Sequence, residues 1–400
     1  MFLRELYYLY KIFSQDKFSH RKKRDLQFFF LKNIVDHAYR NNQFYREFYS
    51  KKKFHPNMLR ALEDIKKIPC VDKSALLKNY RKLIDRKKMK DYKVTYTSGT
   101  TGEEFSVYLD DEANDYNNAI FIRTLMDQGY TPFRKLGFYW YREESNSFFN
   151  KFGISRKVII RQDSNPEKQV EIIRKHKIKY LYYFPFKLLE LANSFDEKHL
   201  RSLKLRRIFC IGEVLTEKMR AYFEKRFGCP VSDNYGLTEF NIAAYRKPGM
   251  TYYKTNWDSV VLEFEDTRKP GIKRPVITSL SNYFMPLIRY RTDDLVMAEN
   301  SRIKRILGRE SDFIKAGKKE VYLGDMVDKM LDFQTVKLFT FKCSGNRLTI
   351  NILPKQVHDK EINGEIKEAF MKLAFKKVSV TINKKIGFSE RGKLKLLDMV

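Results

Sequence analysis

A loop rich in glycine and hydroxyl groups is the first stretch whose residue types could do chemistry. It reads TSGTTG at 97–102, and KVTYTS at 93–98 is typical of a strand entering a turn. Two glycines allow turns that other residues resist, and the amides and hydroxyls could surround an anion such as phosphate. The loop lacks the P-loop pattern G-x-x-x-x-G-K-[ST], and two acids, Glu103 and Glu104, follow it. A hydroxyl-rich turn between two strands is the alternative interpretation.

Five later segments carry carboxylates, an aromatic ring or a lysine that could join such a site. Each has a structural explanation when taken alone: Glu213 could cap a helix, Tyr235 could be a core aromatic, and a C-terminal lysine is usually solvated. The five segments are, in chain order, IGEVLT at 211–216, DNYGLTEF at 233–240, PLIRYRTDDL at 286–295, ILGRESDFIKAG at 306–317 and SERGKLKLLDMV at 389–400.

The elements that must position these segments alternate between strands and helices. Buried strands are expected at 135–141, 157–162, 178–185 and 205–213, with amphipathic helices at 167–177 and 216–228. This alternation predicts an α/β fold with a mostly parallel sheet flanked by helices. Residues 250–307 look more antiparallel, and the segments from 318 onwards suggest a small α+β domain.

Composition limits the partners. The chain has 400 residues, a 43% hydrophobic content that suits two or three domains, and a net charge of +30. Such a field favours polyanions, namely nucleic acid, anionic membranes, lipid pyrophosphates or nucleotides, and a solvated basic surface is the alternative. No nucleic-acid-binding motif is recognisable, so no specific nucleic-acid partner is expected.

Cysteine usage and the lack of long apolar runs indicate a cytoplasmic protein. Cys70, Cys210, Cys229 and Cys343 are far apart, which argues against a zinc ribbon or a disulfide framework. No apolar run reaches the ~18 residues that span a bilayer, and no signal-peptide pattern is present. The amphipathic start, with Phe2, Leu6, Tyr10 and Phe13 at helical spacing and HRKKR at 20–24, could lie on the inner membrane face. A helix packed on its own domain is the alternative.

The order and spacing of the motifs resemble the adenylate-forming superfamily of acyl- and aryl-CoA ligases, peptide-synthetase adenylation domains and luciferases. The upstream segments FYREFYS and LEDIKKIPCVDKSALL resemble its phenylacetate–CoA ligase-like branch, which includes capsular-polysaccharide (CapK-like) proteins. The resemblance implies that a carboxylate and ATP form an acyl-adenylate, which a thiol or amine then attacks. It also implies a helical part at 1–90 and a core at 91–310 of the adenylation domain, with a small mobile α+β domain at 311–400 on a hinge at 311–312.

The same resemblance assigns the nucleotide contacts. The loop at 97–102 should hold the β- and γ-phosphates of ATP. The backbone of Gly212-Glu213 should pack on one face of adenine, and Tyr235, followed by Gly236, should stack on the other. Thr238 should approach the α-phosphate and Glu239 should coordinate Mg²⁺, for which a carboxylate oxygen is suitable. The loop residues are Thr97, Ser98, Gly99, Thr100, Thr101 and Gly102.

Three more residues follow from the resemblance. Asp294 should accept both ribose hydroxyls, and Arg309 should lie near the ribose. Lys393, after Gly392, should neutralise charge on the α-phosphate, with Lys395 as the rival if the register slips by two.

The sequence also departs from the family pattern. Asp293 stands where glycine is usual, so a left-handed backbone would be lost or carried by Asp, and Ser311 replaces an aspartate. Since Ala243, Ala244 and Tyr245 replace the metal ligands of some relatives, no zinc is expected.

The binding site of the carboxylate substrate is the part of the protein that the sequence identifies least well. The resemblance places it between YFPFKLLEL at 183–191 and a helix after Tyr235, and simple core packing is the alternative for the aromatic candidates. The expected activity is AMP-forming carboxylate activation with ATP, Mg²⁺ and, for one class of acceptor, CoA. It would act on a small acid or sugar acid in surface-polysaccharide biosynthesis, with a lipid-linked glycan as a further partner. The alternatives are a phenylacetate-type acyl- or aryl-CoA ligase and a non-catalytic nucleotide-binding protein. The candidate lining residues are Tyr139, Trp140, Phe184, Phe186 and Asn241.

Overall fold

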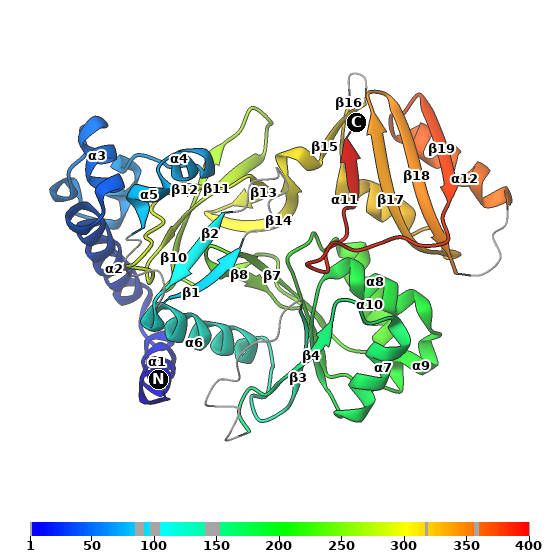
Figure 1. Ribbon diagram of the computed structural model, residues 1–400, viewed down its shortest axis with the longest axis horizontal. Coiled ribbons are helices and arrows are strands. Elements are labelled where there is room, and N and C mark those ends of the chain that lie inside the picture. Colours follow the sequence, from blue (N-terminus) through cyan, green and yellow to red (C-terminus); the bar gives the residue numbers. More distant parts are fainter. Residues whose placement is uncertain are drawn as a thin grey trace. The chain divides into compact units, whose positions relative to one another are not determined.

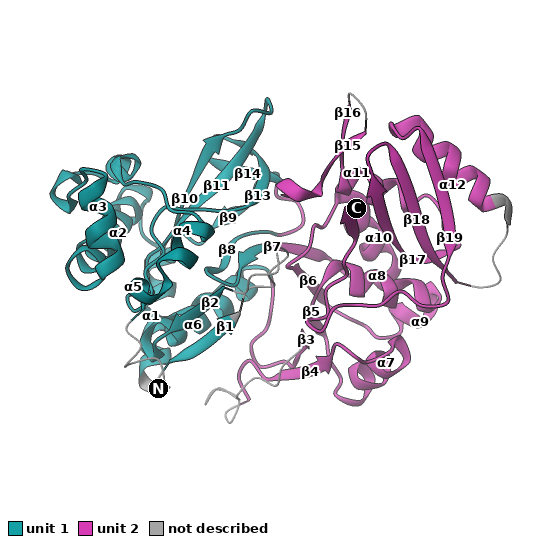
Figure 2. Ribbon diagram, turned by 45° about the horizontal axis from the view of Figure 1, so that its top comes forward, with its two compact units in different colours: residues 1–128, 235–246, 251–305 teal, residues 129–234, 247–250, 306–400 magenta. Residues whose placement is uncertain are grey.

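The chain folds into two compact units, each assembled from segments far apart in sequence (Figure 2). The computed structural model describes residues 2–84, 92–96, 105–140, 153–316, 319–355 and 360–399. Unit 1 comprises residues 1–128, 235–246 and 251–305, and unit 2 comprises 129–234, 247–250 and 306–400. The expected division at 90 and 310 stays a prediction.

The N-terminal part of unit 1 is helical, as predicted (Figure 1). Short polar residues cap these helices: the Ser19 side chain accepts the Lys22 amide, and the Asn42 side chain accepts the Tyr45 amide. Among the described residues no helix is long and apolar enough to span a membrane. The helices are α1 (Phe2–Asp16), α2 (His20–Asn41), α3 (Gln43–Lys51), α4 (Lys73–Lys78) and α5 (Tyr80–Leu83), with 3-10 turns at Pro56–Met58 and Leu62–Lys67.

The rest of unit 1 is largely antiparallel, which confirms the expectation for 250–307. A two-stranded ribbon leads into α6 (Asp111–Asp127), whose first turn is capped by Asp110. Strands β10, β11, β13 and β14 follow one another in a sheet that β12 joins beside β11. The strands are β1 (Lys93–Tyr96), β2 (Ser106–Leu109), β8 (Asn241–Arg246), β9 (Lys254–Thr255), β10 (Val260–Asp266), β11 (Ile272–Ser279), β12 (Tyr290–Arg291), β13 (Asp294–Glu299) and β14 (Arg302–Arg309), whose residues 306–309 belong to unit 2.

Unit 2 is built on a parallel sheet in the order β4-β3-β5-β6-β7, as the alternating pattern predicts. The chain passes from β3 to β4 on one side and then to β5 on the other side of β3. Ligands of such sheets bind outside the carboxyl ends of the strands where the order reverses. The elements are β3 (Leu136–Trp140), β4 (Lys157–Arg161), α7 (Pro166–Lys175), β5 (Tyr180–Tyr183), α8 (Pro185–Ser194), α9 (Glu197–Arg201), β6 (Arg207–Ile211), α10 (Glu217–Phe227) and β7 (Val231–Leu237), whose residues 235–237 belong to unit 1.

The C-terminal part of unit 2 forms the expected α+β arrangement around the sheet β19-β18-β17-β20. It shares one hydrophobic core with the parallel sheet and its helices: Phe186 of α8 packs against Phe339 of β17, with ring centroids 6.4 Å apart. The elements are a 3-10 turn at Glu310–Asp312, β15 (Phe313–Ala316), β16 (Lys319–Tyr322), α11 (Leu323–Met330), β17 (Val336–Ser344), β18 (Arg347–Pro354), α12 (Lys360–Leu373), β19 (Lys377–Ile382) and β20 (Leu397–Met399).

Candidate functional site

Aromatic residues gather where the strand order of unit 2 reverses. Tyr139 and Trp140 end β3, and Phe184 follows β5. The Phe184 ring centroid lies 5.7 Å from that of Tyr139 and 6.0 Å from that of Trp140. The structure therefore brings together three candidates for the acyl site, whereas Phe186 points into the shared core against Phe339.

Glu213, which follows β6, joins two other segments of unit 2. One carboxylate oxygen accepts the backbone N–H of Phe186 at 3.0 Å, and the other accepts that of Leu394 at 3.1 Å. Enclosure of the carboxyl group raises the pKa of Glu213 to about 7, although both N–H groups and Lys393 act in the opposite direction. The backbone of Glu213 is predicted to pack on adenine, and its side chain holds the C-terminal segment against the start of α8.

Lys393 lies at the same strand ends. Its Nζ donates to the carbonyl oxygen of Gly212 at 2.9 Å and lies 5.5 Å from the Phe184 ring centroid. The two Gly-containing motifs meet here although Gly212 and Lys393 are 181 positions apart. The rival Lys395 instead pairs with Asp398 at 2.7 Å, and its side chain is 76% exposed.

Gly392 explains why the lysine is preceded by glycine. Its φ is +75°, and an added Cβ would lie 2.9 Å from the ring of Tyr139 and 3.1 Å from Cβ of Gln162. Both the backbone conformation and the close approach exclude a larger residue. The C-terminal segment therefore rests directly on the end of β3.

Lys187 of α8, which the sequence interpretation missed, contacts the same C-terminal segment. It is 4% exposed on α8, pairs with Glu190 at 2.7 Å and has its Nζ 4.5 Å from the Phe388 ring centroid. Its signal in the sequence is a lone lysine in the apolar run FPFKLLEL. A buried cation that is paired and covered by an aromatic ring packs segment 388–394 onto α8.

In unit 1, Tyr235 and Asp294 form a direct pair. The Tyr235 hydroxyl donates to Oδ2 of Asp294 at 2.8 Å. Burial, together with the Asp294 charge, raises the pKa of Tyr235 well above its ordinary value. The phenol therefore stays a neutral donor at physiological pH, and its partner stays a hydrogen-bond acceptor.

A second tyrosine–carboxylate pair lies in the same unit. The Tyr290 hydroxyl is 3.4 Å from Oε1 of Glu239, and burial followed by the Glu239 charge raises the pKa of Tyr290. Sequence reasoning did not single out Tyr290, which lies within the quoted motif PLIRYRTDDL.

Glu239 is the one carboxylate that the sequence analysis assigned to a magnesium ion. In the described ranges no group of three or more His, Cys, Asp or Glu residues could hold a metal. Mg²⁺ is commonly bound by one or two carboxylates together with substrate phosphates, so a single protein ligand such as Glu239 is compatible with it. The magnesium site stays a prediction.

The predicted helix after Tyr235 is wrong. β7 ends at Leu237, a turn carries the exposed Thr238, and the chain returns as β8. A Cβ on Gly236 would lie 2.4 Å from the Asn241 carbonyl oxygen, so glycine allows this close backbone approach. Asn241 has a φ of +55°, and its side-chain amide donates to the Asn117 carbonyl oxygen on α6. That contact gives Asn241 a structural task, and its acyl-site role stays a prediction.

The remaining sequence predictions are located as follows. Arg309 lies in unit 2 at the end of β14, and its backbone N–H donates to Asp312 at 2.7 Å after Gly308, whose φ is +103°. The backbone of Asp293 is not left-handed, unlike that of several other described residues. Its φ therefore does not require the glycine that is usual at this position. The loop at 97–102 and the acids Glu103 and Glu104 lie outside the described residues.

Comparisons with known proteins agree with this arrangement. Residues 57–276 match the family model described as AMP-binding enzyme. The chain is 28% identical over 308 residues to a phenylacetate–coenzyme A ligase of Pseudomonas putida, covering 70% of this chain and 69% of that protein. It is 24% identical over 329 residues to Protein CapK of Staphylococcus aureus, covering 70% and 67%. The fold is that of a 2-hydroxyisobutyryl-CoA ligase in complex with R3-HIB-AMP, with a TM-score of 0.78, 16% identity and coverage of 95% and 90%.

Proposed function

Because the chain belongs to the AMP-binding enzyme family and is an AMP-forming ligase, we propose that it joins a carboxylic acid to a thiol or amine through an acyl-adenylate. The predicted relation to the phenylacetate–CoA ligase-like branch, with its CapK-like members, is confirmed. In the proposed first step the substrate carboxylate attacks the α-phosphorus of ATP. The bond between the α-phosphorus and the oxygen that bridges it to the β-phosphorus breaks, and pyrophosphate leaves.

One observation carries this mechanism: Lys393 and Gly212 meet at the carboxyl ends of the strands, beside Phe184. A fixed ammonium group there would stabilise the charge that develops on the α-phosphate. Glu213 would act as a positioning residue, since it binds the Leu394 amide next to the lysine. The aromatic side chains of Tyr139, Trp140 and Phe184 would shield the acyl group from water.

The pairs of unit 1 would serve the nucleotide. Asp294 would exchange its bond with the Tyr235 hydroxyl for bonds with the ribose hydroxyls, and the Tyr235 ring would stack on adenine. Glu239 would hold Mg²⁺, which when bound would neutralise phosphate charge, and Thr238 would approach the α-phosphate. The loop at 97–102 would take the β- and γ-phosphates. In unit 2, the backbone at Gly212 would pack on adenine and Arg309 would lie near the ribose.

We further propose a cytoplasmic role in surface or capsular polysaccharide biosynthesis, supported by the similarity to Protein CapK. The acid would then be a sugar acid or a small acyl donor for a glycan. The similarity to phenylacetate–coenzyme A ligases favours the second candidate, an aryl-CoA ligase with CoA as acceptor.

Carboxylate-dependent exchange between ATP and pyrophosphate tests the proposal. The panel would span aryl acids, fatty acids, amino acids and uronic acids, with CoA-dependent release of AMP measured for every acid that supports exchange. Exchange with uronic acids favours the glycan role, and CoA-dependent turnover of aryl acids favours the ligase alternative. Tight ATP binding without exchange for any acid would instead identify a non-catalytic nucleotide-binding protein.

A further inference from the structure

Helix α1 is apolar on two opposite faces, and only one of them is covered within unit 1. The covered face places Tyr8 and Ile12 against Tyr116 and Ile120 of α6. Opposite it, four large side chains at helical spacing stay exposed: Leu6 at 40%, Tyr7 at 55%, Tyr10 at 76% and Phe13 at 36%. Contiguous exposed apolar side chains on one helix face mark an interaction surface more often than scattered ones do.

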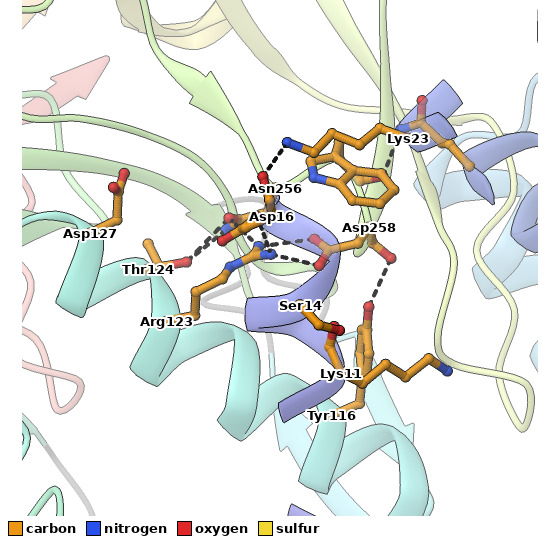
Figure 3. Close-up of polar contacts among 12 residues, drawn as sticks. Lys11, Ser14, Asp16, Lys23, Tyr116, Arg123, Thr124, Asp127, Asn256 and Asp258 are labelled. Atoms are coloured by element: carbon orange, nitrogen blue, oxygen red, sulfur yellow. Dashed lines mark hydrogen bonds and ion pairs between the residues drawn. The ribbon is translucent and has the colours of Figure 1, made fainter. Parts of the chain in front are cut away.

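Ionic contacts fix α1 in this orientation. Arg123 of α6 lies between Asp16, at the end of α1, and the buried Asp258 (Figure 3), at 3.3 and 2.6 Å. Near the other end of the helix, Nε of Arg4 lies 2.6 Å from Oδ2 of Asp115. The outer face is therefore held outward by the buried network rather than exposed through fraying of the terminus.

The surroundings of the outer face are basic. Residues 2–33 contain eight Lys or Arg and three Asp or Glu, a net charge of +5. Of the three acids, Glu5 is 2% exposed, Asp16 pairs with Arg123 and Asp25 is exposed. Of the eight cations, Arg4 pairs with Asp115 and Arg24 with Glu63. Lys17 and Arg21, between this helix and the first turn of α2, are exposed. An apolar and tyrosine-rich stripe bordered by cations complements the interface of an anionic bilayer.

We propose that the outer face of α1, formed by Leu6, Tyr7, Tyr10 and Phe13, docks the protein peripherally on an anionic phospholipid membrane, with the exposed cations Lys17 and Arg21 facing the headgroups. The tyrosine rings would sit at headgroup level with their hydroxyls hydrated, and Leu6 and Phe13 would enter the acyl boundary. Leu6, Tyr7, Tyr10 and Phe13 belong to none of the motifs assigned above to the adenylation chemistry, so this proposal does not depend on that chemistry.

Flotation of the full chain with vesicles tests the proposal. Vesicles of phosphatidylcholine with a third phosphatidylglycerol are compared with pure phosphatidylcholine, at low and high salt. The expected result is binding to the anionic vesicles at low salt and its loss at high salt. The double variant Tyr10→Ser/Phe13→Ser should bind the anionic vesicles at least about tenfold more weakly, because it removes apolar area that the membrane would bury. Lys17→Glu/Arg21→Glu should weaken binding by about tenfold or more.

The matched control is Phe133→Ser, which removes an aromatic ring that is 64% exposed outside this helix and should leave binding unchanged. Unchanged thermal unfolding of all variants shows that the fold persists. The proposal is overturned if the wild type ignores anionic vesicles at low salt, or if Phe133→Ser weakens binding as much as the α1 variants. It is also overturned if wild-type protein self-associates without vesicles and Tyr10→Ser/Phe13→Ser abolishes that association, because a second copy would then cover the face.

Discussion

The carboxylates of the two units are used in different ways. In unit 2 both oxygens of Glu213 accept backbone N–H groups, from Phe186 and Leu394. In unit 1 Asp294 accepts the side-chain hydroxyl of Tyr235. A carboxylate that accepts hydrogen bonds from two backbone segments holds those segments together. A carboxylate that accepts one from a side-chain hydroxyl can exchange that hydroxyl for a hydroxyl group of a ligand. The difference supports our proposal that Asp294 binds the nucleotide, whereas Glu213 holds two segments of the protein together, although both residues belong to motifs that indicate nucleotide binding.

The largest effect is expected at the lysine that Glu213 helps to position. Lys393→Ala should slow ATP–pyrophosphate exchange by about 100- to 1000-fold, the loss typical when one group that stabilises transition-state charge is removed. The matched control is Lys395→Ala, two positions along and paired with Asp398 at 2.7 Å, which should stay within about twofold of wild type. A greater loss for Lys395→Ala than for Lys393→Ala would show that the register of the C-terminal motif is shifted by two.

In unit 1 the carboxylate should matter more than the phenol. Asp294→Asn should raise the KM for ATP by about 10- to 100-fold, because hydrogen bonds to a charged group are lost. Tyr235→Phe keeps the ring for stacking and should raise the KM for ATP by no more than about fivefold. Tyr252→Phe is the control, since it removes a hydroxyl that donates to Glu299 at 2.8 Å outside the motifs. Equal effects of Tyr235→Phe and Asp294→Asn would contradict the comparison.

The docking of the C-terminal segment should depend on its glycine. Gly392→Ala forces a side chain into a left-handed backbone at a φ of +75° and into contact with Tyr139, so docking should weaken by about 1–2 kcal/mol. Exchange should fall by about 5- to 30-fold while ATP binding is kept. Gly387→Ala is the matched control, because an added Cβ there meets no atom within 4 Å. Equal losses in both variants would rule out this docking geometry.

A smaller effect should follow the titration of Glu213. Its pKa is raised to about 7 where the segment is docked, whereas an exposed glutamate titrates near ~4.3. The docked state therefore binds the proton on Glu213 more tightly than the undocked state does. The stability that this adds to docking is complete below the pKa of the exposed glutamate and is lost as pH rises through the pKa of the docked one. Between about pH 6 and pH 8 docking should weaken by about 1 kcal/mol. Limited proteolysis near 384–399 should become faster over this range in wild type, and its pH dependence should disappear in Glu213→Gln. A pH dependence that survives in Glu213→Gln would assign it to another group.

Much of the fold was readable from local pattern. Strands at 135–141, 157–162 and 205–213 and helices at 167–177 and 216–228 are found within a few residues of the expected bounds, because period and capping are local properties. The family resemblance was readable for the same reason, since each motif is a short stretch whose residue types are visible in the sequence. Such patterns do not say whether a residue contacts the ligand or its own chain, and Glu213 is the example.

Tertiary structure decided what local pattern could not. The motifs Gly212-Glu213 and Gly392-Lys393 are visible in the printed sequence, but their meeting depends on how the C-terminal sheet packs on α8. The family resemblance implied a helix after Tyr235, yet the chain turns and returns as a strand, with Gly236 close to the Asn241 backbone. The apolar residues of α1 were visible at once, but only packing against α6 decided which face is covered and which stays exposed. In each case the contact that decides the structure cannot be recognised from the local periodicity of the sequence.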